Sequence, residues 1–370
     1  MERFFENRRI TLYASGTAAL AQAIANCAAR SSATAPEVIV PAYGCPDLVA
    51  ACIYASVYPR LVDVAPSGWS YDHEALSSKL SPNTVAVVAV NLLGIGDGST
   101  ELVRLCKNKN IPLIQDSAQY LPREAIDWPG DYIVLSFGRG KPLNLLHGGA
   151  LIHPPVDADI PSSFPTHYTR KDRLLDSRAA AIAFNLLTRP HVYRMFSALP
   201  GTGLGDVIYK PLANAAPLPE RVWERVASAF ERYRQKSSYR RDVWASALQE
   251  WSAFGIVALD CPGTPVSAEP LRLCLLAPDR PSRDALVTCF NRSGLGASRF
   301  YGTELAEVAE VPQLVRQQGP FPNARALADR LLTLPTHGLV DSDTVRAAHD
   351  LVIAWHSSQR IEAGNPARAL

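Results

Sequence analysis

Residues 84–119 read TVAVVAVNLLGIGDGSTELVRLCKNKNIPLIQDSAQ. The apolar run 85–90 predicts a buried strand, 100–109 a helix, and 112–115 a second buried strand. Continuous runs of valine, isoleucine and leucine are typical of strands that are covered on both faces. Two such strands joined through a helix form a right-handed crossover, so they lie parallel in one sheet. This stretch therefore predicts an α/β fold.

The same alternation extends over the first 152 residues. Further strands are predicted at 38–40, 60–64, 132–137 and 150–152, and further helices at 17–29, 47–55 and 72–79. These elements predict a three-layer, mostly parallel sheet with helices on both faces. In such sheets ligands bind beyond the carboxyl ends of the strands, so the residues that follow each strand are the candidates for a functional site.

The pattern changes after residue 152. Eight prolines predict an irregular stretch over 153–217, with one helical piece at 177–187, which would shape the substrate or dimer region. Residues 220–250 then predict one long amphipathic helix, followed by a strand at 271–276 and helices at 282–293 and 343–356. The sequence thus predicts a large domain over 1–217, and a connecting helix with a smaller C-terminal α/β domain over 218–370.

Composition excludes several classes of protein. The 370 residues contain 37 Lys+Arg and 35 Asp+Glu, which argues against a general nucleic-acid binder. Hydrophobic residues make up 47%, which excludes intrinsic disorder, and charged residues 19%, below the usual ~25%, which favours a surface partly covered by a second subunit. No apolar run approaches the roughly 20 residues of a membrane span. Seven cysteines without CxxC spacing, and no secretory signal, predict reduced thiols in a cytoplasmic protein.

The first candidate segment is Ser15-Gly16-Thr17, a glycine-containing turn that opens a predicted helix. The free N–H groups at a helix start, with the positive end of the helix dipole, can bind a phosphate. A simple helix cap is the alternative interpretation.

The second segment is Asp116-Ser117-Ala118-Gln119, directly after an apolar strand. A carboxylate in this position could pair with the pyridinium nitrogen of pyridoxal phosphate and make its ring an electron sink. The alternative is an aspartate that caps the next turn.

The third segment runs from Ser136 to Pro142 and also follows a strand. Gly138 and Gly140 allow the backbone to approach a ligand, and Pro142 keeps Lys141 out of helical dihedrals. A lysine held among apolar groups near another cation can act as a nucleophile and base. A solvated loop lysine remains the alternative, and Gly148-Gly149 just beyond would form a hairpin turn or open a strand without side-chain bulk.

These segments, in this order, resemble the DegT/StrS-type family of pyridoxal-phosphate-dependent sugar aminotransferases, which have fold type I. The resemblance is carried by SGTAAL at 15–20, VIVPAYGCPDLVAACIYASVYPRLVDV at 38–64, DSAQ at 116–119, SFGRGK at 136–141, and FP with LPTH at 321–337. It covers most of residues 10–152 and 290–345. The lysine segment together with DSAQ is its most specific part.

The resemblance implies pyridoxal 5′-phosphate as the cofactor and a role for each matching residue. Lys141 would join the cofactor as a Schiff base and move a proton, and Asp116 would pair with the pyridine nitrogen. Gln119 would contact the 3-oxygen of the ring. The residues that would hold the phosphate are Gly16, Thr17 and Ser136.

Two positions depart from the family pattern. The family commonly has an aromatic residue that stacks on the cofactor ring where this chain has Cys45, and the nearby aromatic residue here is Tyr43. Either Tyr43 substitutes for it or the stacking is weaker. His147 stands where an acidic residue commonly precedes the Gly-Gly pair.

The expected activity is transamination from an amino acid, with glutamate the expected donor, to a keto acceptor. The family implies a nucleotide-linked keto sugar of polysaccharide or secondary-metabolite biosynthesis, and a homodimer with small-molecule substrates and neither nucleic acid nor membrane as a partner. The alternatives are a pyridoxal-phosphate enzyme with a non-sugar substrate or a different reaction, and a non-catalytic regulator that keeps the fold. Lys141 counts against the sugar dehydratases of this family, in which histidine replaces the lysine.

Overall fold

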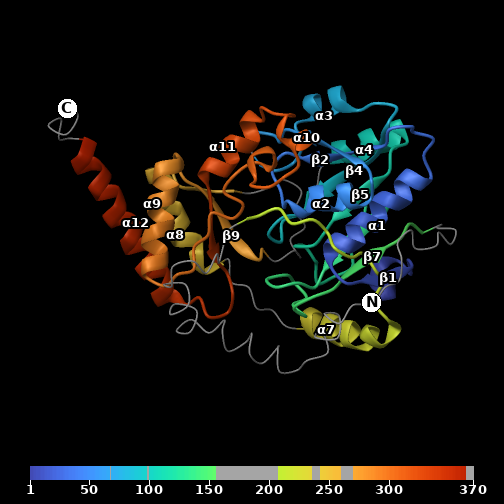
Figure 1. The fold of residues 1–370 in the computed structure, drawn as a ribbon. Coiled ribbons are helices and arrows are strands. Elements are labelled where there is room, and N and C mark those ends of the chain that lie inside the picture. The colour runs from blue at the N-terminus through green and yellow to red at the C-terminus, as the bar shows by residue number, and fades with distance from the viewer. Residues whose placement is uncertain (67, 98–99, 156–206, 236–241, 260–269, 364–370) are drawn as a thin grey trace.

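The computed structural model describes residues 1–66, 68–97, 100–155, 207–235, 242–259 and 270–363 of the 370. The described chain forms two units (Figure 1). The large unit is a seven-stranded sheet with the helices that cover it, and the small unit is a three-stranded sheet with its own helices. The helical piece predicted at 177–187 lies outside the described residues.

The large sheet has the strand order β1-β7-β6-β5-β4-β2-β3. Its strands are β1 (Ile10–Tyr13), β2 (Glu37–Pro41), β3 (Tyr58–Val62), β4 (Thr84–Val90), β5 (Leu113–Asp116), β6 (Tyr132–Ser136) and β7 (Gly149–Ile152). All of them run parallel except β7, which is antiparallel to both of its neighbours. The predicted mostly parallel sheet is confirmed, and β1, which was not expected, adds an edge strand.

Helices cover both faces of the large sheet. Because side chains alternate along a strand, Val38 and Val40 of β2 pack with α1 (Gly16–Ala29) and α2 (Asp47–Tyr54). Ile39, between them, packs on the opposite face with α3 (His73–Lys79) and α4 (Thr100–Lys109). The sheet is therefore the middle of three layers, as the valine-rich runs predicted.

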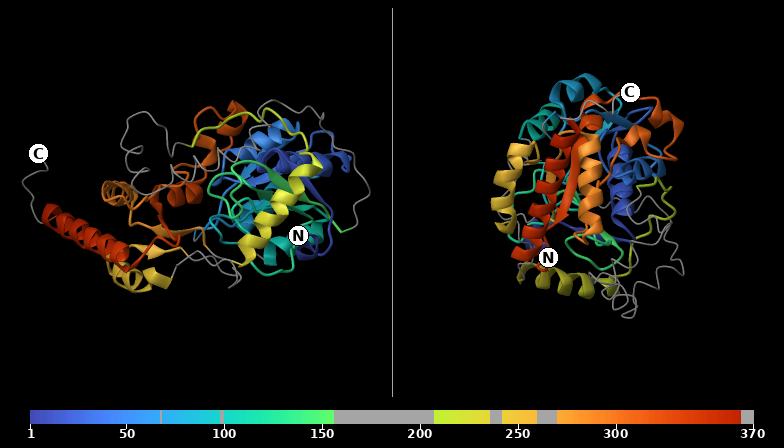
Figure 2. Two further views of the ribbon diagram at one scale, coloured as in Figure 1. Left: turned by 90° about the horizontal axis from the view of Figure 1, so that it is seen from below. Right: turned by 90° about the vertical axis from the view of Figure 1, so that its left-hand side faces the viewer.

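The small unit contains β8 (Val257–Ala258), β9 (Arg272–Leu276) and β10 (Leu331–Pro335), all antiparallel, in the order β10-β9-β8. The helices α8 (Ala245–Trp251), α9 (Arg280–Arg292) and α12 (Ser342–Ala363) lie side by side against this sheet (Figure 2). Trp244, Trp251 and Phe290 form the aromatic centre of its core. The predicted strand at 271–276 and the two predicted helices after it are confirmed as β9, α9 and α12.

The prediction of a single helix over 220–250 is wrong. The structure has α7 (Trp223–Gln235) and, further along the chain, a 3₁₀ turn at Asp242–Trp244 that leads into α8. Val226 and Phe230 of α7 pack with Phe4 of the large unit, and α7 crosses beneath the large sheet (Figure 2). Trp251 of α8 is buried in the core of the small unit. The two halves bury their apolar faces against different cores, and the 3₁₀ turn marks the start of the second, so the described residues form two helices and not one.

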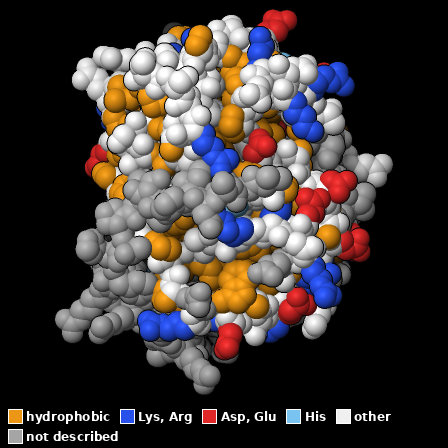
Figure 3. All heavy atoms as spheres, turned by 90° about the vertical axis from the view of Figure 1, so that its right-hand side faces the viewer, with side chains coloured by type: hydrophobic (Ala, Val, Ile, Leu, Met, Phe, Trp, Pro, Cys, Tyr) orange, Lys and Arg blue, Asp and Glu red, His pale blue; other side chains and the backbone are white. Residues whose placement is uncertain are grey.

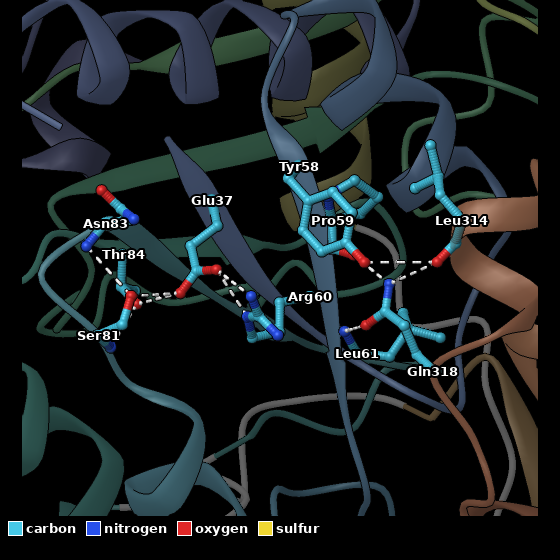
Figure 4. A network of polar contacts seen from close by, with 10 residues as sticks. All are labelled: Glu37, Tyr58, Pro59, Arg60, Leu61, Ser81, Asn83, Thr84, Leu314 and Gln318. Atoms are coloured by element: carbon cyan, nitrogen blue, oxygen red, sulfur yellow. Dashed lines mark hydrogen bonds and ion pairs between the residues drawn. The ribbon is translucent and has the colours of Figure 1, made fainter. Parts of the chain in front are cut away.

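A polar network joins the amino-terminal ends of β2 and β3 (Figure 4). The Glu37 carboxylate accepts hydrogen bonds from Arg60 at 2.6 Å, Ser81 at 2.7 Å and Thr84 at 3.1 Å. Burial alone would raise the pKa of Glu37, but these donors and the charge of Arg60 together lower it. The carboxylate is therefore held ionised at this corner of the sheet.

Both edges of the large sheet are covered. At β3, the Gln318 side chain accepts a hydrogen bond from Leu61 N and donates one to Pro59 O, each at 2.8 Å (Figure 4). At β1, Leu218 N donates to Leu12 O at 2.7 Å. The backbone groups that an edge strand would expose are thus used within the chain.

Residues after α9 return to the large unit. Leu305 N donates to Ala42 O at 2.8 Å, and Asp63, just after β3, accepts from the backbone N–H groups of Asn323 and Ala324 at the start of α11 (Pro322–Arg330). This packing brings residues near 300 to the carboxyl edge of the large sheet. Among the described residues, no helix is both long enough and apolar enough to span a membrane.

Candidate active site

A pocket lies at the carboxyl edge of the large sheet, where the strands end and α1 begins. All the predicted site residues except Tyr43 line it, namely Gly16, Thr17, Cys45, Asp116, Gln119, Ser136 and Lys141. They come from four separate stretches of the chain. The structure therefore brings together residues that the sequence could place only one by one.

The start of α1 forms one wall of the pocket. The Ser15 hydroxyl caps the helix by accepting a hydrogen bond from Ala18 N at 3.0 Å. A Cβ on Gly16 would lie 2.7 Å from Cβ of Ser136, and a Cβ on Gly149 would lie 2.6 Å from N of Gly16. Glycine is required at both positions because the helix start, the end of β6 and the start of β7 meet at backbone distance. The turn can therefore cap the helix and still offer N–H groups to a phosphate, so the two interpretations are compatible.

Asp116 is the last residue of β5 and is only 9% exposed. One carboxylate oxygen accepts a hydrogen bond from Ala118 N at 3.0 Å, which is the turn-capping contact considered above. Burial raises the pKa of Asp116, and the hydrogen bond and the nearby charge of Lys141 act in the opposite direction. A carboxyl group in this condition is stabilised as the anion by any further cation that enters the pocket.

Lys141 is half-buried in the loop after β6, and its side chain lines the same pocket. Its backbone N–H closes a turn by donating to Gly138 O at 3.3 Å, and Gly140 has a φ of +70°, which favours glycine. No hydrogen bond or ion pair of the Lys141 ammonium group occurs within the described part of the chain. The amine therefore faces the pocket without a protein partner there.

Gln119 is held in one orientation. Its Oε1 accepts a hydrogen bond from Leu93 N at 3.2 Å, and its Nε2 donates to the Tyr301 hydroxyl at 3.1 Å. Tyr43 has no exposed surface and meets the Tyr301 ring edge-on, with ring centroids 5.5 Å apart. Tyr43 therefore lies behind Tyr301 and does not reach the pocket surface.

Cys45 does line the pocket, but as a protonated thiol. Burial raises the pKa of Cys45 to about 12, and the nearby charge of Lys141 only partly opposes this. A small neutral thiol cannot provide an aromatic face, so the departure noted in the sequence is a real difference in the wall of the pocket.

Besides Tyr301, two polar residues of the pocket are absent from the predicted site. Asn91 directly follows β4, just as Asp116 ends β5, and it is 1% exposed. Its Nδ2 donates to the Ser117 hydroxyl at 2.7 Å, and its Oδ1 accepts from Asp97 N at 2.7 Å, so it braces the turn after Asp116. The rule of reading the residue after each apolar strand would have found Asn91.

The second missed residue is Asp47, at the start of α2. It is exposed at the mouth of the pocket and accepts a hydrogen bond from the Thr17 hydroxyl at 2.9 Å. The Thr17 hydroxyl is therefore already engaged, which leaves the backbone N–H groups at the start of α1 as the main donors for an anion.

Residues 1–157 match the model of the DegT/DnrJ/EryC1/StrS aminotransferase family. The L-glutamine:2-deoxy-scyllo-inosose aminotransferase of Streptoalloteichus tenebrarius is 30% identical over 143 residues, which are 38% of this chain and 33% of the relative. The 3-amino-5-hydroxybenzoate synthase of Amycolatopsis mediterranei is 26% identical over 130 residues, 33% of each chain. The matches span 23% to 49% of the lengths of the curated relatives.

Solved structures extend the likeness over nearly the whole chain. The aminotransferase TlmJ from Streptoalloteichus hindustanus superposes with a TM-score of 0.67 at 18% identity, covering 97% of this chain and 90% of that one. NtdA from Bacillus subtilis, solved with its bound cofactor PMP, has a TM-score of 0.67 at 15% identity, covering 96% and 77%. The fold is therefore that of these aminotransferases, and the resemblance of the chain to the DegT/DnrJ/EryC1/StrS family is confirmed over residues 1–157.

Proposed function

We propose that this protein is a pyridoxal-phosphate-dependent aminotransferase that transfers an amino group from an amino acid, with glutamate the expected donor, to a keto acceptor. The observation that carries the proposal is the meeting of Lys141 and Asp116 in one pocket beside the start of α1. The family match over residues 1–157 and the PMP-bound neighbour support it. The expected acceptor is a nucleotide-linked keto sugar of polysaccharide or secondary-metabolite biosynthesis.

The residues present fit pyridoxal phosphate. The absence of a Cβ on Gly16 lets the start of α1 approach Ser136 closely, so the N–H groups of the helix start and the Ser136 side chain line the same pocket, as a phosphate site requires. Asp116 would hold the pyridine nitrogen, and the amine of Lys141 would hold the carbonyl end. When bound, the cofactor supplies a carbonyl carbon that exchanges amines and a ring that accepts the electron pair of a broken Cα–H bond.

The side chains of this protein have distinct tasks in that reaction. Asp116, nearly buried, keeps its negative charge when a protonated ring nitrogen lies beside it, and in return it keeps that nitrogen protonated. Lys141 Nζ takes the proton from Cα of the amino donor in the first half-reaction. In the second half-reaction it delivers a proton to the former carbonyl carbon of the acceptor.

A non-sugar acceptor is the second candidate. The relatives named above are an aminocyclitol-forming and an aminobenzoate-forming enzyme by their names, and neither name contains a nucleotide sugar. By contrast, a matching relative from Campylobacter jejuni is named a UDP-4-amino-4,6-dideoxy-N-acetyl-beta-L-altrosamine transaminase. Turnover with a nucleotide-linked keto sugar, compared with a free cyclic ketone, would decide between the two acceptor classes.

We also propose a cytoplasmic homodimer that binds neither nucleic acid nor membrane. On the face shown in Figure 3, basic and acidic side chains are interspersed, which is unlike the continuous basic surface of a nucleic-acid binder. Hydrophobic side chains also gather on the lower part of that face. Together with the low charged fraction of 19%, this supports a surface that is partly covered by a second subunit.

The direct test is spectroscopic. The purified protein with pyridoxal phosphate should absorb near the visible edge, and glutamate should shift that band as the amino group is transferred. Bound cofactor whose band does not shift would favour the non-catalytic regulator. Failure to bind the cofactor would exclude both the aminotransferase and the regulator. Borohydride reduction followed by peptide mass spectrometry should place the cofactor on Lys141; a different lysine would refute the assignment.

A further inference from the structure

Tyr301 reaches the pocket from a distant part of the chain. The other described residues that line the pocket lie between Gly16 and Lys141, whereas Tyr301 belongs to the segment between α9 and α11. Backbone hydrogen bonds hold this segment on both sides of Tyr301. Ser298 pairs with Thr333 of β10 in both directions, at 2.8 and 3.0 Å, and Leu305 donates to Ala42 O at 2.8 Å.

The Tyr301 ring is fixed by aromatic neighbours. Its centroid lies 4.0 Å from that of Phe300 and 5.5 Å from that of Tyr43, which packs edge-on behind it. Since Tyr43 is fully buried and Cys45 carries only a thiol, Tyr301 is the aromatic side chain among the described residues of the pocket wall. It occupies the part of the pocket in which the sequence suggested Tyr43.

The Tyr301 hydroxyl has a proton to give. Gln119 uses its oxygen to accept from Leu93 N, so its nitrogen faces Tyr301 and donates to the hydroxyl oxygen. An oxygen that accepts in this way can direct its own O–H toward a different acceptor. Burial raises the pKa of Tyr301 well above 10, so the hydroxyl stays protonated.

We propose that Tyr301 is a cofactor-binding residue: its ring supplies the aromatic wall that Cys45 does not, and its hydroxyl, beside Gln119, donates to the 3-oxygen of pyridoxal phosphate. The inference rests on the proposed function, because it concerns the same pocket. It also implies a coupling between two events. Cofactor binding stabilises the packing of the segment around residue 301 on the large unit, and that packing in turn strengthens cofactor binding.

The test measures cofactor binding, not turnover. Pyridoxal phosphate is titrated into wild-type protein and into Tyr301→Phe, which keeps the ring, and Tyr301→Leu, which removes ring and hydroxyl. Tyr301→Phe should weaken binding about fivefold, as expected for one lost hydrogen bond, and Tyr301→Leu should weaken it at least about twentyfold. Tyr58→Phe, which removes a tyrosine hydroxyl at the β3 edge, is the matched control and should bind as the wild type does.

A second readout separates the hydroxyl from packing. Removal of a donor leaves more negative charge on the 3-oxygen of the cofactor. This charge favours protonation of the nitrogen through which Lys141 would join the cofactor. The pH midpoint of the visible band should therefore rise in Tyr301→Phe. Wild-type affinity in either Tyr301 variant, or an unchanged midpoint in Tyr301→Phe, overturns the inference while the proposed function stands. Failure of the wild-type protein to bind pyridoxal phosphate overturns the proposed function itself. Near-ultraviolet circular dichroism of each variant verifies that it is folded.

Discussion

The two edges of the large sheet each hold a cationic side chain, but in opposite environments. At the amino edge, Arg8 is 3% exposed, and its guanidinium group donates to the carbonyl oxygens of His153 at 2.6 Å, Gly130 at 3.1 Å and Asp131. At the carboxyl edge, Lys141 is half-buried, and its ammonium group has no hydrogen bond or ion pair among the described residues. The same strands, β5 and β6, run from one edge to the other.

The difference indicates that Arg8 serves the stability of the fold and Lys141 serves the reaction. A buried cation whose three nitrogen atoms each donate to a carbonyl oxygen holds the chain together, and its loss would leave those carbonyl groups unsatisfied. A cation that faces a pocket without partners contributes little to folding, but it can react with what enters. The comparison predicts that changes at the carboxyl edge remove activity and spare stability, and that changes at the amino edge do the reverse.

The largest effect should come from Lys141→Ala. We expect transamination to fall to background because the covalent attachment and the proton carrier are both lost. The free energy of unfolding should change by no more than about 0.5 kcal/mol, as for residues without structural contacts. Single-turnover absorbance with glutamate measures the first quantity and chemical denaturation the second. A large loss of stability would show that Lys141 has structural partners and would break the comparison.

Asp116→Asn should follow in size. The amide cannot keep a ring nitrogen protonated, so we expect the rate to fall on the order of 10²-fold or more while the cofactor still binds. A neutral amide also removes the buried negative charge, which burial penalises by raising the pKa of Asp116. The free energy of unfolding should therefore be kept or slightly increased at neutral pH. Near-normal turnover in a variant shown to hold the cofactor would refute the electron-sink assignment.

Arg8→Met tests the opposite edge. The substitution keeps an apolar stem of similar length but removes the donors to three carbonyl groups, so we expect the free energy of unfolding to fall by about 3 kcal/mol. Activity per folded molecule should be unchanged. Arg3→Met, at an exposed arginine of the same N-terminal segment, is the control and should stay within about 0.5 kcal/mol. Equal stabilities of the two variants would contradict a structural role for the buried Arg8 cation.

The smallest effect is a pH dependence at the same edge. Burial, followed by the charges of Arg9, Arg8 and Arg30, lowers the pKa of His153 to about 3. The folded state therefore holds His153 neutral, and the resulting stabilisation is present above about pH 6.5 and is lost as the pH falls toward 3. Between pH 6.5 and 5 this single group should cost at most about 2 kcal/mol. His153→Gln should flatten the unfolding free energy over that interval, and an unchanged pH profile would contradict the prediction.

The first half of the fold could be predicted because its signals are local. The strands β2 to β6 are short apolar runs, and β2, β3 and β4 are each followed by a helix whose residues lie nearby in the sequence. The strand β1 was missed because its partner β7 lies about 140 residues away and its four residues carry no run of their own. The single helix predicted at 220–250 is wrong for a similar reason. The amphipathic pattern is local and does not indicate which core the apolar face will pack against.

The site divides in the same way. Asp116, Ser136 and Lys141 follow directly from the ends of apolar strands, and the start of α1 is marked by Gly16. Tyr301 could not be found by such a rule, because its contact with Gln119 joins positions 182 residues apart. Tyr43 was a reasonable choice by sequence distance, but the folded segment near residue 300 covers it.

The covered edges of the large sheet limit how copies of this protein can associate. With the Gln318 amide on β3 and the Leu218 backbone on β1, neither side presents a bare strand that could template a neighbour into a continuous ribbon. Growth of fibres by lateral recruitment is therefore blocked at both ends of the sheet. Copies that associate must therefore meet through surfaces other than the strand edges of this sheet.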